Sequence, residues 1–139
     1  MNAVDTNVFV YSLDADESVK QPKAQALLQR LAPAVGSTVL LWQVAAELLS
    51  NLRKLATAGR MTADEVEAHF RDFLALFPLT IPTALVLATY FDLHERFSLS
   101  HWDALLLAAC KEAGVTTLFS EDLNPRTDYD GLTVVNPFA

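Results

Sequence analysis

The sequence is poor in the side chains that form disulfides and zinc sites. It has one cysteine, Cys110, and three histidines among its 139 residues. A single cysteine excludes an intramolecular disulfide and fits a reducing, cytosolic setting. Because Cys110 lies inside an apolar run, we expect it to be a small core residue. His94-Glu95 lacks the second histidine of a zincin motif, so that zinc site is excluded as well.

Long apolar runs and glycine-rich loops are absent too. No apolar run reaches the roughly 18 residues that a membrane-spanning helix needs. The N-terminus carries an acid at position 5 and no basic leader, so we expect no signal peptide and a cytoplasmic protein without membrane association. The four glycines are scattered and form neither a phosphate-binding loop nor a Gly-x-Ser-x-Gly nucleophile elbow. Hydrophobic residues make up 52% of the chain, enough for a single domain over residues 1–139.

Positive charge is scarce. The chain has 10 Lys and Arg against 17 Asp and Glu, which gives a net charge of −7. This balance argues against a nucleic-acid binder that relies on a basic surface. It is compatible with an enzyme that gathers carboxylates around metal ions, because bound cations reverse the local sign of the charge. The acidic surface could also attract a basic segment of a partner.

Apolar periodicity predicts strands that alternate with helices along the chain. The predicted strands are Ala3–Asp5, Thr38–Leu41, Leu79–Ile81, Thr116–Phe119 and Thr133–Val135. The predicted helices are Lys23–Ala32, Gln43–Ala58, a segment from the Thr62-x-x-Glu65 capping box to Pro78, Thr83–Arg96, and a segment from Ser100 to Gly114. The alternation predicts an α/β fold, a three-layer α/β/α sandwich around a mostly parallel sheet.

Two acids stand where such a fold places its functional site, outside the carboxyl ends of the strands. Asp5 ends the first predicted strand, and Asp122 follows the strand Thr116–Phe119. If these strands are neighbours, the two carboxylates meet. Each acid also has a simpler interpretation, because aspartate is common at helix N-caps and in surface turns.

Two further acids lie at or in predicted helices. Asp103 is three residues past Ser100, where it is either a capping partner or a carboxylate that the helix start aims into the same cleft. Glu47 shares a polar helical stripe with Gln43, Asn51 and Lys54, which is typical of a solvated face.

Together these acids offer oxygen ligands only, which favour Mg²⁺ or Mn²⁺ over zinc. Such ions orient a phosphodiester and lower the pKa of a bound water, so a converging quartet would suit nuclease chemistry.

The chain resembles the PIN-domain ribonucleases, in particular the small VapC-type toxins of toxin–antitoxin systems. The resemblance spans the whole length, and the order and spacing of its motifs carry it. These motifs are Asp5-Thr6-Asn7 after the first strand, Glu47 in Val44-Ala45-Ala46-Glu47-Leu48, Trp102-Asp103-Ala104-Leu105, Ser120-Glu121-Asp122 after a late strand, and Asp130-Gly131 followed by Asn136-Pro137-Phe138.

The resemblance implies a single PIN domain whose acids bind Mg²⁺ or Mn²⁺ and cleave single-stranded RNA, often tRNA or ribosomal RNA, with a metal-activated water. Asp5 and Asp103 correspond to the principal metal ligands, and Glu47 and Asp122 complete the catalytic quartet. The side chains implied to orient the ligands are Thr6, Asn7 and Ser120.

The resemblance also implies a homodimer held through helices and inhibition by a cognate antitoxin protein. Few cations are available to contact RNA, and the sequence does not choose among Lys20, Lys23, Arg53, Lys54, Arg60, Arg96 and Arg126. It also leaves open whether Glu121 contributes to the site. Strand alternation puts Glu121 and Asp122 on opposite sides, and the Ser/Thr-x-Asp pattern of the family favours Asp122.

Two other interpretations remain open. A dehalogenase-like phosphatase would use Asp5 as a covalent nucleophile, but it requires an aspartate in place of Asn7 and a suitably placed lysine, and Lys111 lies in the middle of a predicted helix. A catalytically silent PIN-like binding module would need no acids, whereas all four are present.

Overall fold

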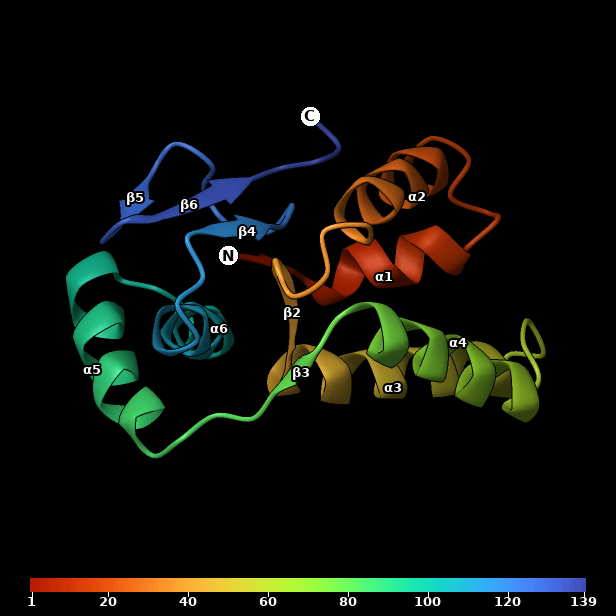
Figure 1. The fold of residues 1–139 in the computed structure, drawn as a ribbon, viewed down its shortest axis with the longest axis horizontal. Helices are drawn as coiled ribbons and strands as arrows, with labels where there is room; N and C mark the ends of the chain where they lie inside the picture. The colour runs from red at the N-terminus through yellow and green to blue at the C-terminus, as the bar shows by residue number, and fades with distance from the viewer.

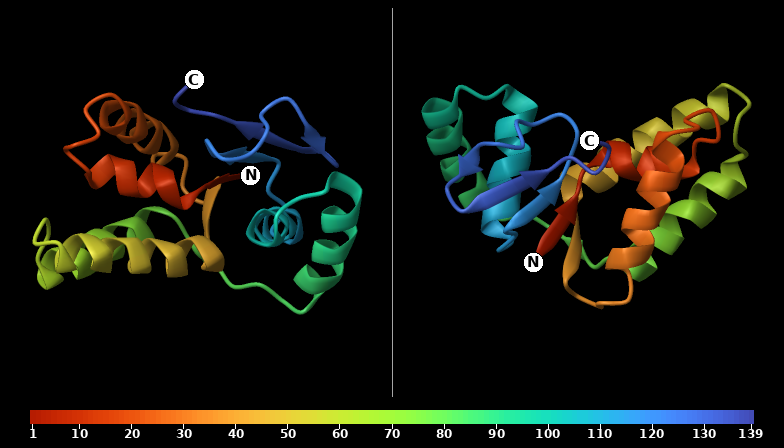
Figure 2. Two further views of the ribbon diagram at one scale, coloured as in Figure 1. Left: turned by 180° about the vertical axis from the view of Figure 1, so that it is seen from behind. Right: turned by 90° about the horizontal axis from the view of Figure 1, so that it is seen from above.

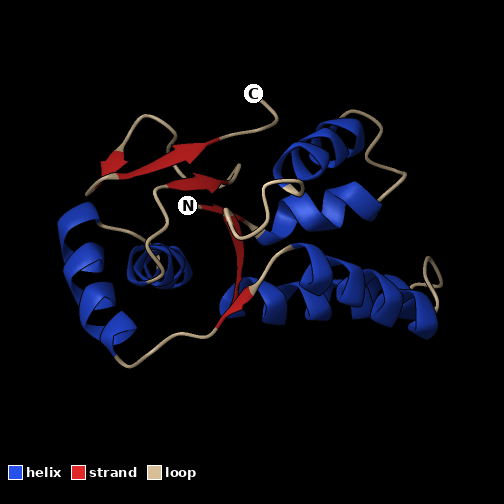
Figure 3. Ribbon diagram, in the orientation of Figure 1, coloured by secondary structure: helices blue, strands red, loops and turns tan.

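The computed structural model describes residues 1–139, and Figure 1 shows its helices and strands. In chain order the elements are β1 (Asn2–Val4), α1 (Thr6–Leu13), α2 (Lys20–Leu31), β2 (Thr38–Leu41), α3 (Trp42–Thr57), α4 (Ala63–Leu76), β3 (Leu79–Thr80), α5 (Leu85–Phe97), α6 (His101–Glu112), β4 (Thr117–Phe119), β5 (Asp128–Tyr129) and β6 (Leu132–Val135). Short strands and longer helices alternate over most of the chain (Figure 3).

The strands form one sheet in the order β3-β2-β1-β4-β6-β5. All neighbouring pairs are parallel except β5 with β6. Strand β1 lies between β2 and β4, and Val4 is in register with Phe119. The predicted mostly parallel sheet is confirmed, and β1 and β4 are the neighbours on which the meeting of Asp5 and Asp122 depends.

Helices cover both faces of the sheet, as predicted. Helices α1 to α4 lie on one face, and α5 and α6 lie on the other (Figures 1 and 2). The chain steps from β1 to β2 to β3 in one direction, and then α5 and α6 return it to β4 on the opposite side of β1. The strand order therefore reverses between β1 and β4. Open parallel sheets form their ligand crevice at such a reversal, outside the carboxyl ends of the strands.

A cluster of 31 buried hydrophobic residues fills the space between the layers. It includes Leu40 and Leu118 from the strands and Leu48 and Leu107 from the helices, each fully buried. Cys110 is also fully buried and unpaired, which confirms it as a core residue. No helix combines the length and the apolar character needed to cross a membrane.

Most predicted elements are present with boundaries shifted by one to three residues. The Thr62–Glu65 capping box forms with both of its reciprocal hydrogen bonds at the start of α4. The last strands differ from the prediction, because residues 128–129 were expected only as part of a turn. In the structure, Asp130 and Gly131 have φ of 61° and 89°, so they close a two-residue hairpin between β5 and β6.

Helix α1 is not predicted by the sequence pattern. Its run Val8-Phe9-Val10-Tyr11 consists of β-branched and aromatic residues, which favour strands locally. Burial against the helices on the same face outweighs that preference, since the Phe9 ring packs edge-on against Phe73 and Phe77 at centroid distances of 4.9 and 5.9 Å.

Candidate active site

Asp5 lies at the point where β1 passes into α1, and it is only 8% exposed. It is the N-cap of α1, and its carboxylate accepts a hydrogen bond from the Thr6 backbone N–H at 2.7 Å. The hydroxyl of Ser120 donates a second bond at 2.7 Å. The Asp5 N–H in turn donates to the Phe119 carbonyl at 2.9 Å, so strand pairing fixes the backbone as well.

Asp122 lies beside it in the loop after β4. Its carboxylate accepts a hydrogen bond from the Asn7 side chain at 2.9 Å, and its N–H donates to the Ser120 hydroxyl oxygen at 3.1 Å. Ser120 therefore links Asp5 to the backbone of Asp122. The pairing of β1 with β4 brings these two acids together, as the sequence predicts.

Glu47 reaches the same place from α3. Its carboxylate accepts hydrogen bonds from the Thr6 hydroxyl at 2.9 Å and from the Gln43 side chain at 3.1 Å. A solvated helix face would leave these groups to water, so the interpretation of Glu47 as an ordinary surface residue is wrong. Glu47 is half-buried, and two other side chains bond to its carboxylate.

Asp103 lies in the first turn of α6. Its N–H donates to the Ser100 hydroxyl at 3.3 Å, which caps the helix. The reciprocal bond of a full capping box is not formed, and the Asp103 carboxylate accepts no hydrogen bond within the chain. This carboxylate is half-buried and free to bind a ligand.

Gln43 is a member of this site that the sequence does not single out. Its side-chain nitrogen donates to Glu47 and also to the Trp102 carbonyl at 3.3 Å, so it joins α3 to the start of α6 beside Asp103. Its side-chain oxygen is buried without a hydrogen-bond partner. The sequence feature that could have identified Gln43 is its spacing of four residues from Glu47, which places both side chains on one helix face.

The four carboxylates repel one another, and this repulsion raises the pKa of Asp5 and of Asp122. Burial raises the pKa of Asp5, and the charges of Asp122 and Glu47 raise it further, against the hydrogen bonds from Ser120 and Thr6. Burial also raises the pKa of Asp122, with repulsion from Glu121 and Asp103 adding to it.

The donor set fits a hard divalent cation, because it consists of carboxylate oxygens whose charges repel one another. No three Asp, Glu, His or Cys side chains are grouped closely enough in the structure to hold an ion directly. Magnesium is commonly held by one or two carboxylates together with several waters, so it does not need three direct protein ligands.

The PIN domain family model matches residues 3–127. The chain belongs to the PIN-domain family. Comparison with the curated proteins finds no significant match. Solved structures with the same fold include FitAcB from Neisseria gonorrhoeae, with 20% identity, a TM-score of 0.72 and 99% of each chain covered. VapBC2 from Rickettsia felis, bound to a promoter DNA fragment, has 15% identity, a TM-score of 0.67 and 97% of each chain covered.

A third similar fold is that of VapC20 from Mycobacterium tuberculosis, which is described as a toxin that cleaves the Sarcin-Ricin loop. It has 17% identity and a TM-score of 0.65, with 88% of this chain and 90% of that chain covered. These likenesses agree with the α/β sandwich of the PIN domain.

The two neighbours Glu121 and Asp122 point to different sets of residues in this PIN domain. Whereas Asp122 meets Asn7, the Glu121 carboxylate accepts a hydrogen bond from the Tyr11 hydroxyl and forms an ion pair with Lys20 at 2.9 Å. Glu121 is therefore held away from the cluster of acids.

The lysine that a dehalogenase-like phosphatase would need is not near the acids. Lys111 pairs with Asp130 in the turn before β6, and residue 7 is an asparagine that donates to Asp122. Neither position supports that alternative. Of the seven candidate RNA-contacting cations, three take part in ion pairs, namely Lys20, Arg60 and Arg96.

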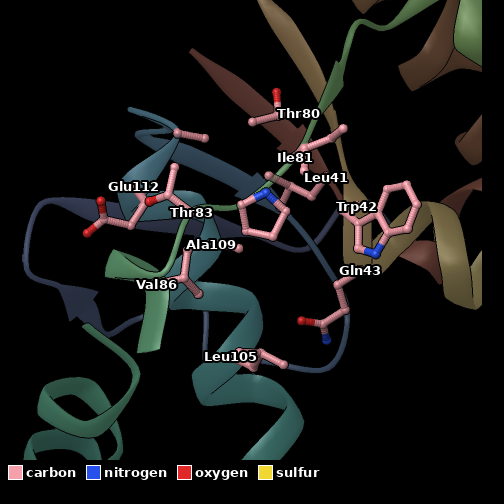
Figure 4. A pocket seen from close by; sticks show the side chains of 12 residues that line it. Leu41, Trp42, Gln43, Thr80, Ile81, Thr83, Val86, Leu105, Ala109 and Glu112 are labelled. Atoms are coloured by element: carbon pink, nitrogen blue, oxygen red, sulfur yellow. The ribbon is translucent and has the colours of Figure 1, made fainter. Parts of the chain in front are cut away.

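A pocket of about 150 Å³ lies beside the start of α3 (Figure 4). It lies between the ends of β2 and β3 and helix α6, and its lining is mostly apolar, including Leu41, Ile81 and Val86. Gln43 lines this pocket and also donates to Glu47, so it links the pocket lining to one of the four acids.

Proposed function

We propose that this PIN domain is the toxin of a toxin–antitoxin pair and acts as a metal-dependent endoribonuclease. The observation that carries the proposal is the convergence of Asp5, Glu47, Asp103 and Asp122 at the reversal of strand order. They come from four separate segments of the chain, yet charge repulsion relates Asp5 to both Asp122 and Glu47, and relates Asp122 to Asp103.

Asp5 and Asp103 would be the principal ligands of Mg²⁺ or Mn²⁺, with Glu47 and Asp122 completing the quartet. When bound, the ion supplies a nucleophilic water and polarises the phosphodiester. The chain's own contribution is to fix the ligands before the ion arrives. Thr6, Asn7 and Ser120 each donate a hydrogen bond to one of the carboxylates, which limits the orientations those carboxylates can adopt.

The proposed substrate is RNA of the ribosomal or transfer class. The structural similarity to VapC20 supports ribosomal RNA as the first substrate to test, since that toxin is described as cleaving the Sarcin-Ricin loop. A net charge of −7 gives little general attraction to RNA, so we expect recognition to depend on the metal ion and a few local contacts.

The proposed partner is a cognate antitoxin. Two of the similar structures are described as complexes of this kind, VapBC2 and a toxin–antitoxin complex from Klebsiella pneumoniae with a TM-score of 0.66. A basic antitoxin segment would complement the acidic cleft. Co-expression with the neighbouring open reading frame should relieve growth arrest caused by this chain, and a frame-shifted copy of that reading frame should not.

We further propose that the protein is a homodimer held through helices. Helix α5 exposes Leu85, Leu87 and Phe91, each more than half exposed. Trp42 at the start of α3 and Trp102 in the first turn of α6 are also more than half exposed. Exposed apolar side chains in this number are typical of a protein–protein interface.

Cleavage of purified ribosomal and transfer RNA by the purified protein tests the nuclease proposal. The expected result is cutting in Mg²⁺ or Mn²⁺ that stops in EDTA and is absent in Asp5→Asn. Cutting that persists in EDTA would overturn the metal-dependent mechanism. No cutting of any RNA together with no metal binding would favour the binding-module alternative.

A further inference from the structure

A second polar cluster lies one helical turn along α1 from the acids. The Tyr11 hydroxyl donates to one oxygen of the Glu121 carboxylate, and the Lys20 ammonium group lies 2.9 Å from the other oxygen. The same ammonium group lies 4.8 Å from the centre of the Tyr11 ring and 3.5 Å from its hydroxyl oxygen. The three side chains come from α1, α2 and the loop after β4, so the cluster joins three segments of the chain.

The helix that supplies Tyr11 to this cluster also supplies the side chain that binds Asp122. Asn7 and Tyr11 are four residues apart and therefore share a face of α1. They bind consecutive residues of the loop, because Asn7 donates to Asp122 and Tyr11 donates to Glu121. One helix face thus holds the loop at two adjacent positions, and the carboxylates of these two residues turn toward different partners.

Apart from these contacts, few interactions fix the position of the Asp122 side chain. It is exposed, its carboxylate accepts only the bond from Asn7, and no helix or regular strand is formed between Phe119 and Asp128. The charge of Glu121 repels it, which contributes to its raised pKa. The pairing of Glu121 with Lys20 offsets this repulsion, and the charge of Lys20 acts in the opposite direction on the same pKa.

The C-terminal segment covers this cluster. The Phe138 ring packs edge-on against Tyr11 at a centroid distance of 5.3 Å, and Lys23 of α2 donates to the Phe138 carbonyl at 3.3 Å. Only 16% of the Glu121 side chain is exposed. Hydrogen bonds and ion pairs shielded in this way are stronger than the same contacts in open water. Hydrogen bonding to Glu121 is the main cause of the raised pKa of Lys20, so Lys20 remains charged at neutral pH.

We propose that Tyr11, Lys20 and Glu121 form a latch that holds the loop after β4 so that Asp122 points at the other three acids. Glu121 is thus a positioning residue for the fourth acid of the quartet and is not a metal ligand. This inference rests on the proposed function, because it assigns the latch to the same metal site.

Tyr11→Phe is the sharpest test, because it removes only the hydroxyl that bonds to Glu121 and Lys20, and it keeps the ring, its contact with Phe138 and all charges. The dissociation constant for Mn²⁺, measured by titration calorimetry, should rise about 10-fold, the lower end of the range for groups that orient ligands. The matched control is Thr89→Val, which removes a hydroxyl that donates to the Glu112 carboxylate at the opposite end of α6 from Asp103, and it should leave the constant unchanged. If Glu121 acted only through its charge, Tyr11→Phe would also leave the constant unchanged.

Substitutions at Lys20 provide a second test. Lys20→Arg keeps the ion pair and should retain Mn²⁺ affinity within about 2-fold, whereas Lys20→Gln should weaken it several-fold. In RNA cleavage at limiting Mn²⁺, Lys20→Gln should lower kcat and leave KM for RNA unchanged. A raised KM with unchanged kcat would contradict the latch, because it would mean that Lys20 contacts the RNA.

Hydrogen exchange separates failure of the latch from failure of the proposed function. In the metal-free protein, Tyr11→Phe should speed amide exchange at Glu121, Asp122 and Leu123 at least 5-fold, while Thr89→Val should not. Unchanged exchange and unchanged Mn²⁺ affinity would overturn the latch and leave the nuclease proposal standing. If the wild-type protein binds no Mn²⁺, the proposed function fails, and the exchange rates alone decide whether these residues hold the loop.

Discussion

The Ser120 hydroxyl donates a hydrogen bond to the Asp5 carboxylate at 2.7 Å, and both residues are buried. The same hydroxyl oxygen accepts the N–H of Asp122 at 3.1 Å. One small side chain at the end of β4 therefore fixes two of the four acids, and it does so from the strand that pairs with β1.

Ser120→Ala should weaken Mn²⁺ binding about 10-fold, because Asp5 and Asp122 lose the group that orients them. It should also lower the free energy of unfolding by about 1–3 kcal/mol, since buried polar groups lose their partner. The control is Ser12→Ala, another buried serine, which loses a bond to the Phe9 carbonyl at 2.6 Å. It should lower stability and leave Mn²⁺ affinity unchanged. Equal metal affinities in the two variants would contradict the assigned role of Ser120.

Asp5→Asn should stabilise the metal-free protein at neutral pH. Burial raises the pKa of Asp5 above its unfolded value of 3.8, so the folded state binds the proton more tightly. Stability therefore falls as the pH rises through the window above 3.8, and the ionised carboxylate is unfavourable at pH 7. Asparagine can still cap α1.

In EDTA at pH 7, Asp5→Asn should therefore raise the thermal midpoint above that of the wild-type protein. The difference should shrink near pH 4, where the carboxyl group is increasingly protonated. A lower midpoint at pH 7 would show that Asp5 stabilises the fold as an ion.

Thr38→Val should be stabilising. The Thr38 hydroxyl is buried at the start of β2 and has no hydrogen-bond partner. Valine has nearly the same shape, favours strands and removes the unpaired group, so we expect a gain of about 1 kcal/mol in chemical unfolding. The exposed strand residue Thr133 is the control, and Thr133→Val should change stability by less than about 0.5 kcal/mol. A loss of stability in Thr38→Val would reveal a partner for this hydroxyl.

Phe91→Glu and Leu87→Glu should convert a dimer into monomers, because they place charges on the exposed apolar face of α5. Sedimentation velocity over a range of concentrations measures the change. Leu76→Glu is a control, since Leu76 is an exposed apolar residue of α4. Monomers at every concentration in the wild-type protein, or a dimer that survives both α5 substitutions, would contradict an interface through this face.

Sequence patterns were sufficient for the succession of strands and helices from β2 to β4 and for placing Asp5 and Asp122 just after strands. Strand exits and helix starts are local features, and the pairing of β1 with β4 then brings Asp5 and Asp122 together. Helix α1 was missed because its aromatic and β-branched run becomes helical only through burial.

The partners of each acid were harder to derive than the acids themselves. Whether Glu47 faces water or the cleft depends on the Thr6 hydroxyl 41 residues away. Likewise, the separation of Glu121 from Asp122 depends on Tyr11 and Lys20, which lie on helices packed against the loop. Periodicity places a side chain on a face of its own helix, but it does not say which other element covers that face.

The central claim is that Asp5, Glu47, Asp103 and Asp122 form one divalent metal site. Titration calorimetry with Mn²⁺ tests it, using Asp→Asn or Glu→Gln at each of the four positions and Asp72→Asn as the control, an exposed acid on α4. We predict that the wild-type protein and the control bind Mn²⁺ equally, and that each of the four substitutions weakens binding by about 10-fold or more. Binding that all four substitutions leave unchanged, or no binding by the wild-type protein, would contradict the account.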